Sequence, residues 1–315
     1  MTISLDGKVA VVTGSGRGLG RAYARALAAH GAAVVVNDVD GAVAGAVVDE
    51  ITAAGGRAVA EVVAVGPSAA ADGLVGRAVE AFGRLDIMCT NAGVLRDKMV
   101  WRLEDEDFDL VVETHLRGTF TCVRAAVRQF RAQNDAAGET GPRGGRIVAI
   151  SSVAGQYGNL GQTAYSAAKA GIAAMVRTWA LELERHGITA NAVVPNALTR
   201  MVATIPGMAQ VVEAAERGEP VPASLRMGMG LGTPDDVAPL VVFLASDAAA
   251  TITGQAIFLG GDRLALFAHP HERSVAFEEG GWTVEKLSDL FANSVGQQLE
   301  PYGIPLMGRK QPTAG

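Results

Sequence analysis

The chain has 315 residues, of which 49% are hydrophobic, and a formal net charge of -6. This is enough apolar material for a large core, and the acidic balance excludes the basic surface of a nucleic-acid-binding protein. Cys89 and Cys122 lie in apolar segments, which favours buried thiols in a reducing compartment over a disulfide. No signal pattern opens the chain, and no apolar run approaches the roughly 18 residues that span a bilayer. We therefore expect a soluble, cytoplasmic protein with no membrane or nucleic-acid partner and no metal site.

The first element in chain order is a short apolar strand over residues 8–12 that runs into a glycine-rich turn and an Ala-rich helix. In the turn, Gly14 can supply the tight bend, Gly18 the close approach of backbone amides to a pyrophosphate, and Gly20 the contact of helix on strand. A merely flexible turn is the alternative. Between a first strand and a first helix, this pattern favours dinucleotide binding.

The second strand, residues 33–37, ends at Asp38, where an acidic side chain would meet the adenosine ribose. A carboxylate accepts hydrogen bonds from the 2′-hydroxyl and repels a 2′-phosphate, so the sequence favours NAD over NADP. Asp38 could instead cap a helix, although Asp40 is available for that task. Arg17 in the turn could accept a phosphate.

Strand and helix signals then alternate, which predicts a Rossmann-type, doubly wound parallel sheet of about seven strands with helices on both faces. The later strands are expected at residues 58–65, 85–90, 146–150, 189–194 and 256–259, and a long helix at about 105–133. We expect a single domain over residues 5–262 and a helical extension over residues 263–315. Asn91-Ala92-Gly93 follows the fourth strand, at the sheet edge where ligands bind in such folds.

The strand at residues 146–150 delivers Ser151 and Ser152, and Tyr165 and Lys169 follow in an Ala-rich helix. Tyr165 and Lys169 are four residues apart, so their side chains leave the same helix face. A cation near a phenol favours the phenolate, so we expect Tyr165 to have a lowered pKa and to act as an acid/base. A polar stripe on a surface helix is the alternative.

Two regions near the end of the chain lie outside this pattern. Residues 199–232 are rich in Met, Gly and Pro and are expected to form an irregular, adaptable apolar lid, with a disordered loop as the alternative. In the extension, Thr283 begins a helix that places Val284, Leu287, Leu290 and Phe291 on one face. We expect this helix to pack on the core or on a neighbouring subunit, with a disordered tail as the alternative.

In order and spacing, these motifs resemble the short-chain dehydrogenase/reductase family over residues 5–262. The motifs are Thr13-Gly14-x3-Gly18-x-Gly20, Asn91-Ala92-Gly93, Ser152, Tyr165-x3-Lys169 and Pro195-x3-Thr199. Within the family, the chain is most similar to the (3R)-hydroxyacyl-CoA dehydrogenase domain of peroxisomal multifunctional enzymes, and also to bacterial 3-oxoacyl reductases and hydroxysteroid dehydrogenases. The local matches are residues 36–38, 115–118, 157–162 and 195–197.

The resemblance implies a role for each matching residue. Tyr165 would be the general acid/base, Ser152 would hold the substrate oxygen, and Lys169 would lower the Tyr165 pKa and bind the nicotinamide ribose. Thr199 would bind the nicotinamide carboxamide and Asn91 would line the cofactor ribose. The implied cofactor-binding set is Gly14, Arg17, Gly18, Leu19, Gly20, Asp38, Asn91, Ala92, Gly93, Tyr165, Lys169, Pro195 and Thr199.

His115 departs from the family pattern, because most members carry Asn there and use it in a proton relay through water to the lysine. A neutral imidazole can still order a water, and its protonation near pH 6.5 would add pH dependence. The alternative is a packed helix histidine with no relay role.

Together these features predict an NAD-dependent oxidoreductase that interconverts a secondary alcohol and a ketone, with a 3-hydroxyacyl thioester of CoA as substrate. A hydroxysteroid dehydrogenase, with a steroid-like substrate, or a 3-oxoacyl-ACP reductase is the alternative, and a non-catalytic dinucleotide sensor is a remote one. The resemblance further implies a homotetramer or homodimer built partly through the helices at about 105–131 and 165–186.

Overall fold

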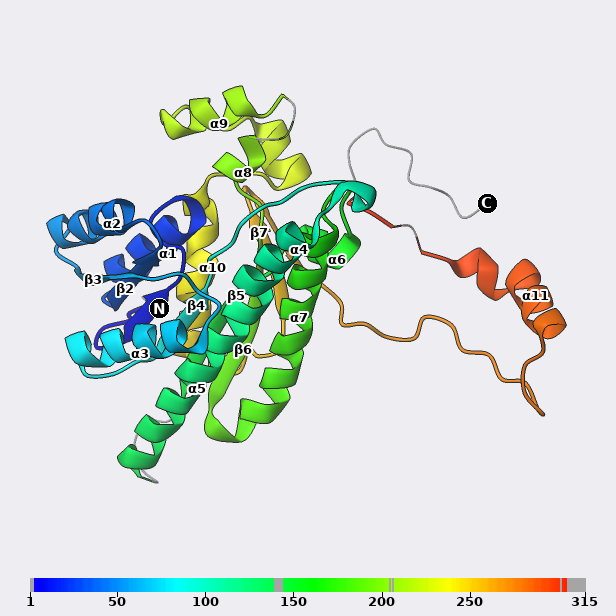
Figure 1. The fold of residues 1–315 in the computed structure, drawn as a ribbon, viewed down its shortest axis with the longest axis horizontal. Helices are drawn as coiled ribbons and strands as arrows, with labels where there is room; N and C mark the ends of the chain where they lie inside the picture. The colour runs from blue at the N-terminus through cyan, green and yellow to red at the C-terminus, as the bar shows by residue number, and fades with distance from the viewer. Residues whose placement is uncertain (1–2, 139–143, 204, 206, 301, 305–315) are drawn as a thin grey trace.

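An eight-stranded sheet forms the centre of the fold (Figure 1). The computed structural model describes residues 3–138, 144–203, 205, 207–300 and 302–304. The strand order is β3-β2-β1-β4-β5-β6-β7-β8, and all neighbours are parallel except β7 and β8. The Rossmann-type fold expected from the sequence is confirmed, with one strand more than the seven expected. The strands are β1 (Val9–Val12), β2 (Ala33–Asp38), β3 (Arg57–Val62), β4 (Ile87–Thr90), β5 (Gly145–Ile150), β6 (Ile188–Pro195), β7 (Ala256–Gly260) and β8 (Arg263–Leu266).

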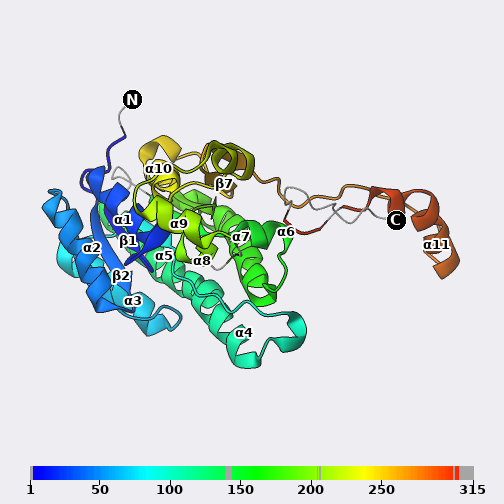
Figure 2. The same ribbon diagram turned by 90° about the horizontal axis from the view of Figure 1, so that it is seen from above.

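Helices cover both faces of the sheet (Figure 2). On one face lie α1 (Gly18–Ala29), α2 (Gly41–Ala53) and α10 (Pro234–Ala245), and on the other α3 (Ser68–Phe82), α5 (Gly118–Ala137) and α7 (Thr163–Leu183). Because apolar helices lie above and below, every residue of β1 and of β4 is buried. Within the described residues, no helix is long and apolar enough to cross a membrane.

The reversal of strand order lies between β1 and β4, because β1 continues to β2 on one side and β4 to β5 on the other. Ligands of open α/β sheets bind outside the carboxyl ends of strands at such a reversal. The glycine turn after β1 and Asn91 after β4 meet there.

The helix expected over residues 105–133 is interrupted. It consists of α4 (Asp105–Val112), a π-helical turn (Glu113–Arg117) and α5. A π turn holds one more residue per turn than an α-helix, so it changes which side chains face inward. Here the buried residue of the turn is His115.

The lid, residues 199–232, is not irregular as expected in the part that the structure describes. It contains α8 (Arg200–Ala203), α9 (Ala209–Glu216) and a π-helical turn (Ser224–Met229). Leu198, Val212, Val221 and Leu231 form a small apolar cluster of their own beneath these helices. Val212 and Leu231 are almost fully buried, so the lid has a small apolar core of its own. Met201, Met227 and Met229 remain exposed, as an adaptable apolar surface requires.

The chain beyond β8 leaves the core. Residues 263–266, expected in the extension, instead form β8 at the sheet edge. The helix expected from Thr283 is present as α11 (Val284–Asn293), and Thr283 Oγ1 accepts a hydrogen bond from the Lys286 N–H at its start. Both views place α11 away from the sheet and its helices (Figures 1 and 2). The last part of the expected extension, residues 305–315, lies outside the described residues.

Candidate active site

The turn between β1 and α1 forms a cradle of bare backbone. Gly14 has a φ of +61°, and a Cβ there would lie 2.6 Å from the Ala92 Cα. Gly18 has a φ of +53°, and the nearest atom to a Cβ there would be Thr199 Cγ2 at 3.9 Å. The tight contact at Gly14 closes the turn onto the end of β4, and the open space at Gly18 leaves room for a ligand beside Thr199.

The amino terminus of α1 has free hydrogen-bond donors at this cradle. Arg17 precedes the helix without making a side-chain cap, and the first turn contains no acidic residue. The first amides of a helix have no partner within it, and the helix dipole makes this end positive. These groups fit the pyrophosphate of a dinucleotide.

Thr13 and Asn91 hold the cradle in shape. The Thr13 hydroxyl oxygen accepts the N–H groups of Asn91 at 3.0 Å and Ala92 at 3.1 Å. The Asn91 amide donates to the Thr13 and Gly14 carbonyls at 3.0 and 2.9 Å. The Asn91 side chain is therefore used to brace the glycine turn. Thr13 was not among the expected site residues, although its place directly before Gly14 was a usable signal.

Asp38 lies against the same turn at the end of β2. One carboxylate oxygen accepts the Gly16 N–H at 3.1 Å and the other accepts the Asp40 N–H at 3.2 Å. Asp40 caps α2 by accepting the N–H groups of Ala42 and Val43. Asp40 also pairs with Arg17 at 3.1 Å, so this guanidinium already has a carboxylate partner.

Ser152, Tyr165 and Lys169 meet at the carboxyl end of β5. Ser152 begins α6 (Val153–Tyr157) and accepts the Ala154 N–H at 3.2 Å, and its side chain hydrogen-bonds Tyr165. The buried Lys169 ammonium donates to the Ile150 carbonyl at 2.6 Å and lies 5.7 Å from the centre of the Tyr165 ring. Ser151 instead donates to the Lys169 carbonyl at 2.8 Å, which ties α7 to β5.

The electrostatics of this cluster differ from expectation. Burial raises the pKa of Tyr165, the hydrogen bond from Ser152 opposes that rise, and the Asp97 charge adds to it. Burial lowers the pKa of Lys169 to about 7. The expected lowering of the Tyr165 pKa is wrong for this chain, because burial of the phenol outweighs the hydrogen bond from Ser152.

His115 packs against the catalytic tyrosine. Its ring meets the Tyr165 ring edge-on with centroids 5.1 Å apart, and its Nε2 lies 2.8 Å from the Val94 carbonyl oxygen and 3.0 Å from the Val94 N. The Nδ1 atom is buried without a hydrogen-bond partner among the described residues. Burial and the nearby Lys169 lower the His115 pKa to about 3, so the expected titration near pH 6.5 is wrong.

Two loops meet beside the cluster. The Gln162 amide donates to Asp97 at 2.7 Å, and the Lys98 N–H donates to the Gly161 carbonyl at 2.9 Å. These bonds join the segment after β4 to the segment between Ser152 and Tyr165. The sequence did not reveal these bonds because the partners are more than 60 residues apart.

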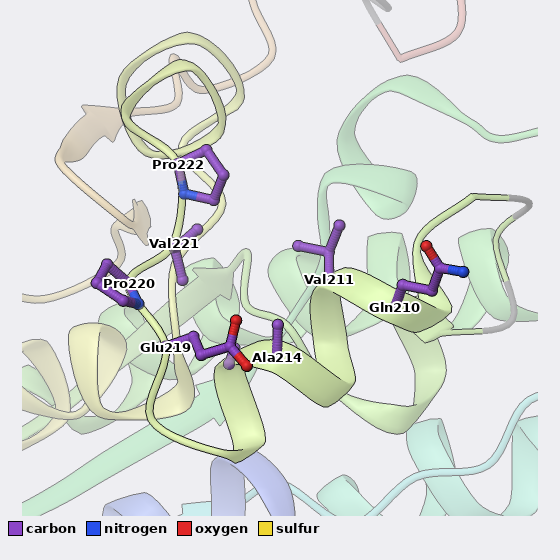
Figure 3. A pocket seen from close by; sticks show the side chains of 8 residues that line it. Gln210, Val211, Ala214, Glu219, Pro220, Val221 and Pro222 are labelled. Carbon is purple, nitrogen blue, oxygen red and sulfur yellow. The ribbon is translucent and has the colours of Figure 1, made fainter.

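The lid is anchored by Arg226. Its guanidinium forms a two-bond fork to Asp236 in α10, with both bonds at 2.9 Å, and reaches Asp262 at 2.7 Å. Asn196, after β6, adds a bond to the Met229 carbonyl at 2.9 Å. A cavity of about 240 Å³ lies within the lid, between α9 and residues 219–222 (Figure 3). None of its lining residues belongs to the catalytic cluster.

A dinucleotide cradle and a serine, tyrosine and lysine at one rim of a doubly wound sheet define an oxidoreductase that uses a nicotinamide cofactor. Comparison with known proteins identifies its family. A family profile described as enoyl-(acyl carrier protein) reductase matches residues 14–261, which is most of the chain. The chain belongs to the short-chain dehydrogenase/reductase family, and it acts on CH–OH groups with NAD(P).

Individual relatives extend the similarity beyond the profile. The hydroxyacyl-CoA dehydrogenase ChsB1 of Mycobacterium tuberculosis is 44% identical over 307 residues, covering 94% of this chain and 92% of that protein. The peroxisomal multifunctional enzyme type 2 of Mus musculus is 43% identical over 212 residues, covering 64% of this chain and 27% of that protein. The crystal structure of a short chain dehydrogenase from Mycobacterium avium has a TM-score of 0.80 and 37% identity, covering 97% of this chain and 99% of that one.

Proposed function

We propose that the chain is an NAD-dependent 3-hydroxyacyl-CoA dehydrogenase that interconverts the 3-hydroxyl group and the 3-ketone of an acyl thioester. The observation that carries the proposal is the Ser152–Tyr165–Lys169 cluster at the rim of the dinucleotide cradle. The substrate class is supported by 44% identity to a hydroxyacyl-CoA dehydrogenase over nearly the whole length of both chains.

Tyr165 is the proton-transfer group of this proposal. Its raised pKa keeps the phenol protonated at neutral pH, so it can donate a proton to the oxygen of a ketone as that oxygen gains charge. Ser152, bonded to the same phenol, orients the substrate oxygen and stabilises the developing charge. When bound, the nicotinamide supplies or accepts the hydride.

Lys169 restores the proton that Tyr165 gives up. With a pKa of about 7, its ammonium both gains and loses a proton near neutral pH. The unpartnered His115 Nδ1 is buried beside it and can bind a water that connects Lys169 to solvent. Neutral His115 would thus replace the asparagine of the family relay without titrating itself.

The choice of NAD over NADP rests on Asp38. Its carboxylate is fixed at the end of β2 by two backbone N–H groups, on the side of the cradle where a ribose 2′-hydroxyl would bind. Arg17, the cation of the turn, is paired with Asp40 rather than available to a 2′-phosphate. We infer from the same family resemblance a homodimer or homotetramer, supported by the exposure of Phe108, Leu110 and Phe120 on α4 and α5.

The test is a set of initial rates with acetoacetyl-CoA and a keto-steroid, each with NADH and with NADPH. We expect NADH to support reduction of acetoacetyl-CoA with the higher kcat/KM. Reduction of the keto-steroid alone would favour the hydroxysteroid alternative. Binding of NADH with no turnover of either compound would favour a sensor, and a clear NADPH preference would contradict the role of Asp38.

A further inference from the structure

Asp97 lies on the segment that follows β4, and this segment borders Tyr165 on two sides. The segment first passes the His115 ring, which packs on Tyr165 and contacts the Val94 backbone. Three residues later the Asp97 carboxylate accepts the Gln162 amide at 2.7 Å. Gln162 directly precedes α7 and is three residues before Tyr165. Asp97 is therefore fixed at the end of α7 that carries the catalytic tyrosine.

The charged side chains of this segment point in two directions. Arg96 and Lys98 both reach the Asp107 carboxylate on α4, at 3.4 and 2.5 Å. Asp97, between them in the chain, instead reaches Gln162. Successive side chains of an extended chain leave opposite sides, which explains this alternation. The two cations are therefore paired on the α4 side, and the carboxylate of Asp97 faces the start of α7.

The negative charge of Asp97 acts on the catalytic tyrosine. Burial raises the pKa of Tyr165 most, the hydrogen bond from Ser152 opposes this rise, and the Asp97 charge adds to it. The Asp97 charge thus disfavours an anion at the Tyr165 oxygen. Another anion held beside that oxygen would meet the same repulsion, because the Coulomb energy depends on charge, distance and surroundings.

Two simpler roles do not account for a carboxylate at this position. As Tyr165 gives up its proton in ketone reduction, a nearby negative charge opposes the phenolate that forms, so Asp97 does not assist that step. The bond to Gln162 joins two loops, but the oxygen of an asparagine would accept the same amide. A carboxylate differs from a carboxamide chiefly in its charge, so the role to be explained is electrostatic.

We propose that Asp97 restricts the substrate to uncharged derivatives of a 3-keto acid, such as its thioesters, and excludes the free acid. This inference rests on the proposed function, in which Tyr165 donates a proton to the 3-ketone oxygen. In a free 3-keto acid the ionised carboxylate is only two bonds from the ketone carbon, so it lies beside the phenol whenever the ketone is in place. The Lys169 ammonium is buried and donates to the Ile150 carbonyl, so it is not presented to a substrate carboxylate. In an ester or thioester the same group is neutral and meets no repulsion.

The test compares ethyl acetoacetate with acetoacetate, which share the 3-ketone and differ in charge at neutral pH. Initial rates with NADH give kcat/KM for each, and acetoacetyl-CoA is measured alongside. Asp97→Asn keeps an acceptor for Gln162 and removes only the charge, and Asp97 is exposed, so folding is not at risk. The preference for the ester over the free acid is expected to fall by about tenfold in this variant, equivalent to roughly 1.4 kcal/mol.

Asp109→Asn is the matched control, because Asp109 is an exposed aspartate of α4 and its loss removes the same charge. This variant should keep the preference of the unchanged protein. If acetoacetate is reduced too slowly to measure, its inhibition constant against ethyl acetoacetate replaces its kcat/KM. An Asp97→Asn protein with an unchanged preference would overturn the proposal, whether both rates persist or both fall together.

The same assays separate this inference from the proposed function. Reduction of ethyl acetoacetate without reduction of acetoacetyl-CoA would contradict the proposed function, while the preference would still report on Asp97. Reduction of acetoacetyl-CoA together with equal kcat/KM for the ester and the free acid would overturn the role of Asp97 alone. No reduction of any of these compounds would contradict both.

Discussion

The glycine cradle and the lid are held in shape by different forces. In the cradle, short backbone and side-chain hydrogen bonds join Thr13, Asn91 and Asp38 to neighbouring strands. In the lid, a small apolar cluster and the ion pairs of Arg226 carry the structure, and methionines face outward. Hydrogen bonds specify one geometry, whereas an apolar cluster can repack. The cradle therefore has one fixed geometry, whereas the lid can adapt.

The largest effect is expected at the Ser152–Tyr165–Lys169 cluster. Tyr165→Phe removes the proton donor and keeps the ring that packs on His115, so kcat should fall by about 10³-fold, within the range of general acid/base catalysis. NADH binding, measured by fluorescence titration, should persist. Tyr157→Phe is the control, because Tyr157 accepts the Gly303 N–H with its backbone carbonyl, which the substitution keeps. Substantial turnover by the Tyr165 variant would exclude its acid/base role.

The glycine cradle is tested next, through the choice between NADH and NADPH. Asp38→Asn keeps the shape and removes the charge, so the ratio of kcat/KM with NADH to that with NADPH should fall by about 10- to 100-fold, the value of a hydrogen bond to a charged group. Asp49→Asn, an exposed aspartate of α2, loses the same charge away from the cradle and should change nothing. Equal ratios in both variants would remove Asp38 from cofactor selection.

His115 gives a smaller effect that depends on pH. Its pKa is about 3 when folded and about 6.5 when unfolded, so the unfolded state binds the extra proton between these values and stability falls as the pH is lowered through 6.5. His115→Asn should remove about 1.6 kcal/mol of the stability lost between pH 6.5 and 5.0. Urea unfolding at both values measures this. Identical losses in both proteins would mean that the imidazole is not held neutral.

A substitution in the lid gives the smallest expected effect. Arg226→Gln removes the fork to Asp236 and the contact to Asp262, so the lid should open more often and KM should rise about fivefold, equivalent to roughly 1 kcal/mol. Arg217→Gln breaks a pair that stays within the lid and serves as the control. Equal KM values for the two variants would show that Arg226 does not control the lid.

Motifs with short spacing made much of this protein predictable. The glycine turn, Asp38 at the end of β2 and the Tyr165–Lys169 pair lie within single strand–turn–helix units, so local geometry places them. The parallel, doubly wound sheet with helices on both faces followed from the alternation of elements. Arg226, Thr13 and the Asp97–Gln162 bond were not foreseen, because their significance depends on partners in other elements. The lid was misjudged since its ordering cluster joins residues from Leu198 to Leu231.

By itself the sequence determined the sheet, the glycine cradle and the Tyr165–Lys169 pair. Each of these depends on contacts within a few residues or on the alternation of elements. Only the tertiary structure decided how those residues are charged and which helix turn presents His115. A pKa depends on all the groups that exclude water from a side chain, and those groups come from β4, β5, α5 and α7 together. For the same reason the sequence could suggest that α11 needs a partner, but only the folded core revealed that its own surface does not provide one.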